Sequence, residues 1–501
     1  MKRRTFVRST LAASAALAIP RRPLEAFYRE VPARPADLTA VTGDGREVTL
    51  SGSDVSDFAA RLRGRLLLAG DDGYDDARMI LNPDFNKHPA LIVQPTGVAD
   101  IRSAVDFARE HDGLLVAVKC GGHSHSGQST CDRGIQIDLS HFRDVRVDPA
   151  AMSARITGGS LLGQLDHESM AFGLVVPMGT VSHTGVGGLV TGGGFGRLAR
   201  RFGLSVDNLL AVDVVTADGE LRHASATENP DLFWGVRGGG GNFGIVTSFE
   251  FRLHPMQRRV LGGAIMFPFT RARDVLKLYG DYAHEQPDEL QLDLVMTQPA
   301  GGAPPMAGYG VCYSGDPAGA EAALAPVRGI GTPIADTVGP VDYVALQRSG
   351  DVDDPRAVAG YMKSGFVTAM PSGLIDALVE NFRGDSRRLT QVVFQQAGGQ
   401  IARTSPDATA FAQRDAIANM LPSVGWAFGT DREPHVAWCR EYWTHVEPFT
   451  HGFYNNDNGI ESTVENVASN YEMNLERLTA VKNRYDPTNL FRLNANIRPT
   501  V

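Results

Sequence analysis

The most regular hydrophobic pattern in the chain lies between residues 90 and 139. Residues 90–93 and 114–118 are apolar runs of the length of a buried strand. Between them, the apolar residues of segment 98–108 recur at helical spacing and form one stripe. Residues 135–139 then alternate between apolar and polar side chains. The pattern predicts a strand–helix–strand unit followed by a further strand.

Similar patterns predict the elements that follow. Alternating runs and helical spacing indicate strands at 145–147 and 154–156 and a helix at 161–172. The apolar run 209–215 is followed by Asp218-Gly219, which favours a tight turn and predicts a hairpin.

Residues 256–450 form a candidate second domain. Segment 290–295 alternates as a strand, and segments 274–282 and 317–325 have helical spacing. This region therefore predicts a sheet with helices. Residues 20–80, by contrast, are polar and give little indication of structure.

Three glycine-rich segments point to a ligand. Strand 114–118 leads directly into Gly121 and Gly122, which are followed by His123 and Ser124. Glycine lets backbone N–H groups approach a bound group closely, and such N–H groups form concavities that bind phosphate. Further glycine-rich segments occupy 177–196 and 238–247. One such motif would be weak evidence, but the first two segments are dense glycine loops some sixty positions apart, each after a strand, and together they predict a ligand with a pyrophosphate and a flat ring.

The length and net charge of the chain indicate how many domains it has and which partners it does not bind. The chain has 501 residues, which favours two domains over one. Its formal net charge of −9 disfavours nucleic acid and anionic membranes as partners, since both need basic patches.

The N-terminus predicts export. Residues 2–8 carry a twin-arginine pattern, an apolar run covers 11–19, and 16–18 offer a small-x-small cleavage site. We expect residues 1–20 to be a signal read by the twin-arginine export machinery, which carries folded proteins to a periplasmic or extracellular location. A basic start without signal function is the alternative. No later stretch is long and apolar enough to span a bilayer.

The cysteine pattern gives no metal site. Cys120, Cys131, Cys312 and Cys439 show no CxxC spacing, so a structural zinc site is not expected. Cys120 and Cys131 flank the first glycine loop and could form a disulfide after export. Buried free thiols are the favoured interpretation for all four cysteines.

Several motifs in consistent order resemble one family. Gly121-Gly122-His123-Ser124, the glycines of 185–196, the segments 229–234 and 240–247, and the closing segment 485–497 are similar to the motifs of the berberine-bridge-enzyme-like FAD-linked oxidases. These flavoproteins are of the vanillyl-alcohol-oxidase, or PCMH, type. The resemblance extends from about residue 87 to 498.

The resemblance implies an α+β fold. It places a two-subdomain PCMH-type FAD-binding domain at 85–255. It places a substrate domain, with an antiparallel sheet and flanking helices that roof the flavin ring, at 256–450. Residues 451–501 are expected to return to the FAD-binding domain.

The resemblance gives His123 a specific role. The family histidine at this position bonds to the 8α-methyl carbon of the flavin, so the cofactor is expected to be FAD on an 8α-histidyl link. Many relatives add a cysteinyl bond, but the matching position here is Val181, which cannot form a thioether. We therefore expect a single covalent bond. From the residues alone, His123 and His125 could instead be an HxH metal pair, although no further ligands are suitably spaced.

Other positions are expected to contact the cofactor. By the resemblance and their place in the glycine loops, they are Lys119, Cys120, Gly121, Gly122, Ser124, Gly127, Gly179, Ser182, Thr184, Gly185, Gly187, Gly188, Gly193, Ile245, Val246, Asn456, Asn494 and Asn496.

The segment 452–457 resembles the family's Tyr-x-Asn motif and makes Tyr454 the candidate base. Its pKa of ~10 must fall, or its proton must leave together with the hydride. If it does not act as base, Tyr454 packs against the pocket. The predicted protein is an oxidase that passes hydride from a small alcohol, sugar or amine-type substrate to the flavin, with O2 as acceptor and H2O2 as product. The alternatives are a dehydrogenase with another acceptor, an HxH metal-dependent hydrolase and a non-catalytic binding protein.

Overall fold

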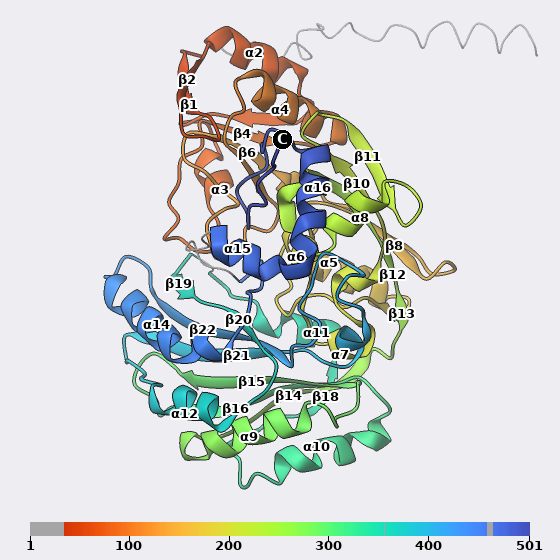
Figure 1. The fold of residues 1–501 in the computed structure, drawn as a ribbon, viewed down its shortest axis with the longest axis vertical. Coiled ribbons are helices and arrows are strands. Elements are labelled where there is room, and N and C mark those ends of the chain that lie inside the picture. The colour runs from red at the N-terminus through yellow and green to blue at the C-terminus, as the bar shows by residue number, and fades with distance from the viewer. Residues whose placement is uncertain (1–34, 355, 458–463) are drawn as a thin grey trace, which may run out of the picture.

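The computed structural model describes residues 35–354, 356–457 and 464–501 (Figure 1). The predicted export signal at 1–20 lies outside the described residues. In the part of the chain that is described, no helix is both long and apolar enough to cross a membrane. All four cysteines are free thiols, and three of them are buried.

The first sheet follows the predicted strand–helix–strand pattern. β4 (Leu91–Gln94) and β5 (Val116–Lys119) both pair in parallel with β6 (Ile135–Asp138), which lies between them. α4 (Val98–Glu110) connects β4 to β5 and buries the apolar stripe that the sequence predicts. The carboxyl ends of β5 and β6 therefore lie at one edge of the sheet, where α/β sheets place ligands.

The polar N-terminal region contains elements that the sequence pattern did not indicate. They are β1 (Leu38–Val41), β2 (Glu47–Leu50), α2 (Gly52–Arg61), β3 (Arg65–Leu67) and α3 (Tyr74–Arg78). β3 extends the first sheet beside β4, and Phe58 of α2 stacks on Phe107 of α4 with ring centroids 4.2 Å apart. Each element is short and buries only a few apolar residues, so no long periodic run marks it.

The second sheet is antiparallel and holds the predicted hairpin. Its order is β11 (Leu221–Ser225), β10 (Leu209–Val215), β12 (Ile245–Arg252), β8 (Ser153–Thr157) and β7 (Val145–Asp148). Packed with it are β9 (Leu174–Val175), β13 (His254–Pro255), α5 (Leu162–Met170), α6 (Val186–Gly192), α7 (Ala199–Phe202) and α8 (Pro230–Val236).

The third sheet is large and antiparallel. Its main path is β17 (Ala335–Asp336), β14 (Arg259–Pro268), β16 (Met306–Tyr313), β15 (Leu290–Gln298), β21 (Arg388–Gln396), β22 (Ala418–Ala427) and β19 (Val358–Met362). β18 (Gly339–Asp342) pairs with β14, and β20 (Gly365–Val367) pairs with β22.

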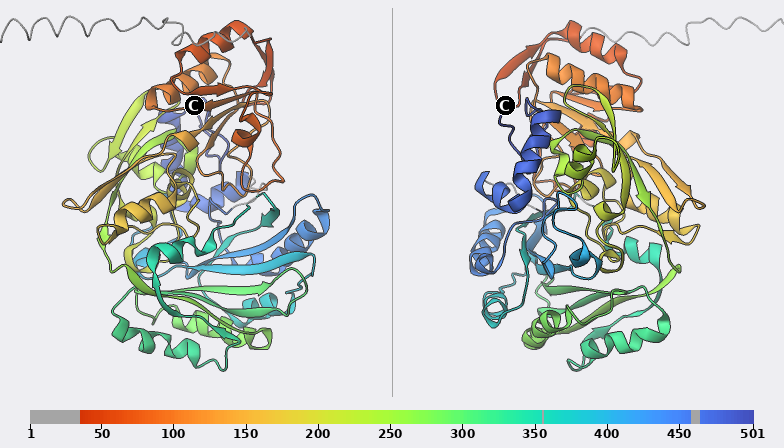
Figure 2. Two further views of the ribbon diagram at one scale, coloured as in Figure 1. Left: turned by 180° about the vertical axis from the view of Figure 1, so that it is seen from behind. Right: turned by 45° about the vertical axis from the view of Figure 1, so that its right-hand side comes forward.

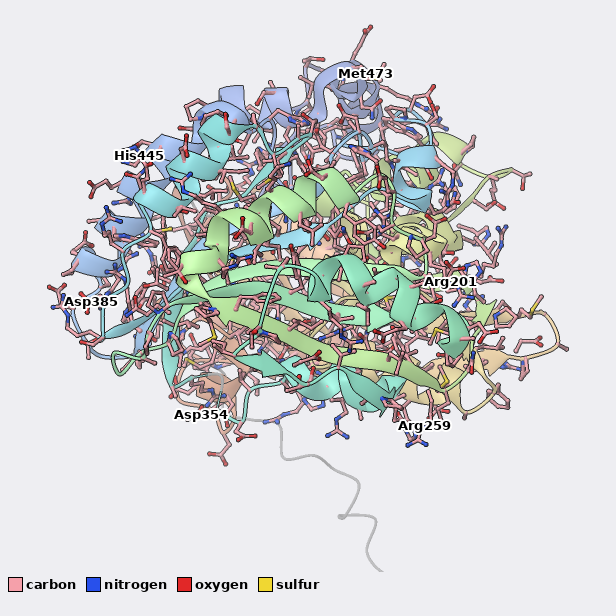
Figure 3. All side chains as sticks on the ribbon, turned by 90° about the horizontal axis from the view of Figure 1, so that it is seen from below. Arg201, Arg259, Asp354, Asp385, His445 and Met473 are labelled. Carbon is pink, nitrogen blue, oxygen red and sulfur yellow. The ribbon has the colours of Figure 1, made fainter. Side chains whose placement is uncertain are left out.

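Helices cover the face of this sheet that is turned away from the other two sheets (Figures 1 and 2). They include α9 (Ala272–Tyr282), α10 (Ala320–Arg328) and α12 (Ser372–Glu380), while α14 (Glu433–Val446) packs on β22. Seen from below, α9 and α10 lie in front of the strands (Figure 3). The opposite face is turned toward the other two sheets, which is the side on which the sequence analysis expects a site beneath this sheet (Figures 1 and 2). Two short helices, α11 (Tyr343–Gln347) and α13 (Gln400–Arg403), lie in its connections.

The C-terminal segment returns to the first part of the chain. α15 (Val464–Tyr471) and α16 (Leu475–Tyr485) lead the chain end back toward the first sheet (Figure 1), and α16 packs against α8. A fully buried ion pair fixes this return: Lys482 Nζ lies 2.7 Å from an Asp486 carboxylate oxygen and also donates to the carbonyl oxygen of Asn242. The architecture is α+β, as predicted.

Candidate functional site

The first glycine loop meets the second by direct backbone contact. A Cβ atom added to Gly121 would lie 2.3 Å from the backbone nitrogen of Gly185, and one on Gly185 would lie 2.3 Å from that of Gly121. No side chain fits between the loops, so glycine is required at both positions. This contact brings residues some sixty positions apart to one place.

A cavity lies beneath this contact. Most of the residues that the sequence predicts to bind the cofactor line this cavity. They are Cys120, Gly121, Gly122, His123, Ser124, Gly179, Thr184, Gly185, Gly187, Gly188, Ile245, Val246, Asn456 and Asn494, joined by the predicted base Tyr454.

Five predicted contacts lie outside the lining of this cavity: Lys119, Gly127, Ser182, Gly193 and Asn496. Lys119 was expected to balance a pyrophosphate. Instead, its ammonium group donates to the carbonyl oxygen of Ala77 and lies 3.7 Å from Asp138 Oδ2, so its charge is already matched inside the protein.

The other four are held in different ways. Gly127 packs against the ring of Phe85. Ser182 donates hydrogen bonds to the Asp351 carboxylate, and Gly193 faces the rings of Phe411 and Tyr454. Asn496 Oδ1 is buried with no hydrogen-bond partner among the described residues.

The chemistry of the cavity fits a long polar ligand that carries phosphate. Ser129 Oγ and Asn494 Oδ1 belong to residues of its lining and are buried without a hydrogen-bond partner in the described chain. Such groups are costly to bury unless something else satisfies them. A Cβ atom added to Gly188, which lines the cavity in the first turn of α6, would meet open space, so its backbone can be approached by a ligand. Backbone N–H groups of the glycine loops suit phosphate oxygens, while the Asn494 amide oxygen can accept from a hydroxyl or N–H group and the Ser129 hydroxyl can donate or accept, as a dinucleotide requires.

His123 is held by a second histidine. Its Nε2 lies 2.6 Å from Nδ1 of His183, and its Nδ1 lies 3.3 Å from Thr184 Oγ1. Burial, then His183 and His125, lower the pKa of His123 to about 3. The ring is therefore neutral at ordinary pH and keeps a lone pair, as a nucleophile needs.

Sequence reasoning assigned no role to His183. Its loop is held by Asp351, which accepts hydrogen bonds from the Ser182 backbone N–H at 2.7 Å and hydroxyl at 2.6 Å. The only sequence signal for His183 was a histidine beside the second glycine loop. The contact between His183 and His123 depends on how the two loops pack and cannot be read from the sequence.

Tyr454 is buried and its hydroxyl oxygen is already occupied. It accepts hydrogen bonds from the Gly194 backbone N–H at 2.8 Å and from the Asn456 amide at 2.7 Å. Burial, together with the nearby Asp457, raises the pKa of Tyr454 despite these bonds. The role of Tyr454 as base remains a prediction.

Asp457 is a further titratable group of the same cavity, and sequence reasoning gave it no role. Its Oδ2 accepts a hydrogen bond from Asn419 Nδ2 at 3.0 Å, and this amide also donates to Gln395. Gln395 and Asn419 are opposite each other in β21 and β22. Burial raises the pKa of Asp457 to about 7, although the hydrogen bond from Asn419 acts to lower it. The roofing sheet thus supports a carboxyl group that ionises near neutrality.

Within the part of the chain that the structure describes, the histidines are not part of a metal cluster. Over residues 35–354, 356–457 and 464–501, no group of three or more His, Cys, Asp or Glu side chains is arranged to hold a metal ion.

Comparison with known proteins decides the family. The family described as "FAD binding domain" matches residues 89–225, and "Berberine and berberine like" matches residues 453–498. The (R)-6-hydroxynicotine oxidase of Paenarthrobacter nicotinovorans is 32% identical over 469 residues, covering 87% of this chain and 97% of its own. The chain belongs to the berberine-bridge-enzyme-like family of FAD-linked oxidoreductases.

Solved structures of this family share the fold. The crystal structure of 6-hydroxy-D-nicotine oxidase from Arthrobacter nicotinovorans superposes with a TM-score of 0.80 at 29% identity, over 87% of this chain and 98% of the other. Glucooligosaccharide oxidase from Acremonium strictum, described with a 6-S-cysteinyl, 8α-N1-histidyl FAD, superposes with a TM-score of 0.80 at 25% identity. The superposition covers 89% of this chain and 98% of the other. The predicted family, the PCMH-type fold and the assignment as an FAD-linked oxidoreductase are confirmed.

Proposed function

We propose that this FAD-linked oxidoreductase is an oxidase of a small polar molecule. It takes hydride from a carbon that bears a hydroxyl or amine group, as in an alcohol, a sugar or an amine, and passes the electrons to O2, giving H2O2. A dehydrogenase with another acceptor is the alternative. The observation that carries the proposal is one cavity that joins three glycine loops and a neutral histidine to a carboxyl group beneath the roofing sheet.

We further propose that FAD is attached through one bond, to His123 at its 8α-carbon. Val181 lines the cavity where doubly attached relatives have cysteine, so no second bond forms. The glycine loops, Ser129 and Asn494 would hold the cofactor. When bound, the flavin supplies hydride acceptance and the return of electrons to the acceptor.

The residues of the chain would handle the proton and orient the substrate. We propose that Asp457 accepts the substrate's hydroxyl or amine proton, because its carboxyl group ionises near neutrality and a general base works best with a pKa near the operating pH. Asn419 would fix the orientation of this carboxyl group. Tyr454, with its oxygen held by Gly194 and Asn456, would position the loop that carries Asp457.

The polar groups of the roof favour a substrate with hydrogen-bonding groups. Gln395 and the two asparagines of segment 455–456 line the cavity near Asp457. The names of the relatives cover both a hydroxylated nicotine and an oligosaccharide. The proposal therefore keeps both amine and sugar substrates.

Two further proposals concern the whole chain. We propose that the twin-arginine pattern at 2–8 directs export after folding. We also propose residues 85–255 as the FAD-binding domain, 256–450 as the substrate domain and 451–501 as the returning segment. The packing of α16 against α8 supports the last assignment.

The test is anaerobic reduction of the purified protein by a substrate panel. We expect one class among sugars, secondary alcohols and amines to bleach the flavin absorption near neutral pH, and air to restore it with release of H2O2. Reduction without reoxidation by air would favour the dehydrogenase. A flavin that no member of any class reduces would contradict the proposed function.

A further inference from the structure

A second cavity lies at the carboxyl edge of the first sheet. It has a volume of about 620 Å³, and the last residue of each parallel strand lines it: Gln94 of β4, Lys119 of β5 and Asp138 of β6. None of these three residues lines the cavity described above. Parallel sheets place ligands beyond the carboxyl ends of their strands, and pockets of roughly 300–1,000 Å³ hold small organic molecules. The second cavity therefore has the position and the size of a separate ligand site.

A buried amide oxygen of this cavity has no hydrogen-bond partner. Only 7% of the surface of Gln94 is exposed. Its Nε2 donates to Asp138 Oδ2 at 3.1 Å, and this bond fixes the orientation of the amide. The Oε1 atom of the same amide is buried and receives no hydrogen bond from the described residues. Because a buried acceptor without a partner is costly, a bound molecule that donates a hydrogen bond would stabilise this arrangement.

Apart from histidines, four cationic side chains line the cavity, and two of them are matched by carboxylates. Lys119 Nζ lies 3.7 Å from Asp138 Oδ2, and a guanidinium nitrogen of Arg356 lies 3.1 Å from Asp76 Oδ1. Both carboxylates belong to the lining as well. These two pairs are neutral, so the net charge of the lining comes from the other two arginines.

Arg65 and Arg143 form no ion pair with a carboxylate of the described residues. Each donates to a backbone carbonyl oxygen instead, Arg65 to that of Asp72 at 2.9 Å and Arg143, through Nε, to that of Gly159 at 3.1 Å. The terminal N–H groups of Arg143 thus stay available to a ligand. A guanidinium group matches the oxygens of a carboxylate or a phosphate.

This positive charge reaches the buried end of the cavity. Burial lowers the pKa of Lys119, the Asp138 carboxylate acts to raise it, and the charges of Arg356 and Arg143 lower it again. An anion bound among these cations would relieve their repulsion. The chain as a whole has a formal net charge of −9, so an excess of positive charge in one cavity is a local feature.

We propose that the second cavity binds a hydroxylated organic anion. Its carboxylate or phosphate group lies on Arg143, Arg65 adds to the positive field, and one of its hydroxyl groups donates to Gln94 Oε1. This ligand is distinct from the flavin and from the substrate of the first cavity. His123 lines both cavities, so the anion lies next to the residue proposed to hold the flavin.

The test is isothermal titration calorimetry of the purified full-length protein. Glycerate supplies a carboxylate with hydroxyl groups, and propionate is its match without hydroxyl groups. Glycerol phosphate supplies the phosphate, and glycerol is the neutral match. The variants are Arg143→Gln, Arg65→Gln and Gln94→Leu, with Arg146→Gln as the control. Arg146 is an exposed arginine of β7 outside the lining of both cavities.

We expect glycerate or glycerol phosphate to bind and glycerol not to bind, and the tighter of the two anions identifies the anionic group. R143Q should weaken binding about 10-fold, because it removes a hydrogen bond to a charged group. R65Q should weaken it about 3-fold, because it removes charge but no direct bond. Q94L should weaken glycerate binding about 5-fold and leave propionate binding unchanged. R146Q should bind like wild type.

Three outcomes would overturn the proposal: no binding of either anion at millimolar concentration, wild-type affinity in R143Q, or an equal loss in R146Q. Propionate bound by wild type as tightly as glycerate would overturn the role of Gln94. If thermal unfolding shows that R143Q does not fold, R65Q and Q94L decide in the same way. The calorimetry measures binding alone, so its failure leaves the proposed oxidase function standing.

Discussion

Burial sets the protonation of the two residues on which the proposed chemistry depends. It lowers the pKa of His123 to about 3 and raises that of Asp457 to about 7. Both shifts favour the neutral form, because a buried charge loses its hydration. His123 therefore stays a nucleophile at any ordinary pH, whereas Asp457 changes its charge within the physiological range.

Replacing Asp457 by Asn should remove a pH dependence. Turnover of the wild type should rise with pH through about 7, as the carboxyl group loses its proton, and then level off. D457N should turn over ~10²-fold or more slowly, without this rise. Tyr454→Phe should lose ~10-fold or less and keep the rise, since it removes only hydrogen bonds. Steady-state rates across pH check this, and a rise retained in D457N but lost in Y454F would favour Tyr454 as the base.

The stability of D457N gives a check that needs no substrate. A carboxyl group whose pKa is raised on folding stabilises the fold below the unfolded pKa, and this contribution is lost as pH rises through about 7. Above pH 7, D457N should therefore have a larger free energy of unfolding than wild type, by on the order of 4 kcal/mol at most. Near pH 4, the free energy of unfolding of D457N should be no larger than that of wild type. Asp166, buried with its pKa also raised to about 7 but outside the cavity, is the matched control. D166N should show the same stability trend with an unchanged pH dependence of turnover.

The sequence located His123 because a histidine follows two glycines at a strand end, a local signal. It did not locate the roles of His183 and Asp457. His183 lies sixty residues from its partner, and Asp457 follows a turn far along the chain from Asn419 of β22, which donates to it. Such roles arise only when distant segments meet.

Among the elements, periodic runs were predicted well. β4, α4, β5 and β6 match the hydrophobic pattern because each buries a continuous apolar stripe or run. The elements between 38 and 78 were missed. α2, for example, buries only Gly52, Val55 and Phe58 among ten residues, so its pattern does not stand out from the polar background.

The returning helix α16 carries a testable ion pair. Replacing Lys482 by Met leaves the Asp486 carboxylate buried without its cation, although the backbone N–H groups of Leu490 and Phe491 still bind it at 2.7 and 2.9 Å. Breaking a buried pair in this way costs about 3–5 kcal/mol. Chemical denaturation should show this loss for K482M. Lys277→Met, which breaks an exposed pair with Asp281 on α9, should cost less than about 1 kcal/mol, and equal costs would contradict the role of the buried pair.

At the scale of the whole molecule, three regions build one site. The first sheet and second sheet supply the glycine loops, the large sheet supplies the roof, and the C-terminal segment adds Asn494 and the loop of Asp457. The expected division into domains came from the motifs of the resemblance, which occur in order along the chain. The chemistry of the cavity could not be predicted from the sequence, because Gln395 is an ordinary polar strand residue until the fold places it in the lining, and Asn419 acts only through its hydrogen bonds to Gln395 and Asp457.

The central claim is that this cavity holds FAD on a single bond to His123. The most direct measurement is the mass of the acid-denatured wild-type chain, followed by mapping of its peptides. We predict the mass of the polypeptide plus one FAD, less the hydrogens lost on bonding, with the flavin on the peptide that contains His123 and none on the peptide of His123→Ala. A wild-type chain with the bare polypeptide mass, or a flavin carried by another residue, would contradict the account.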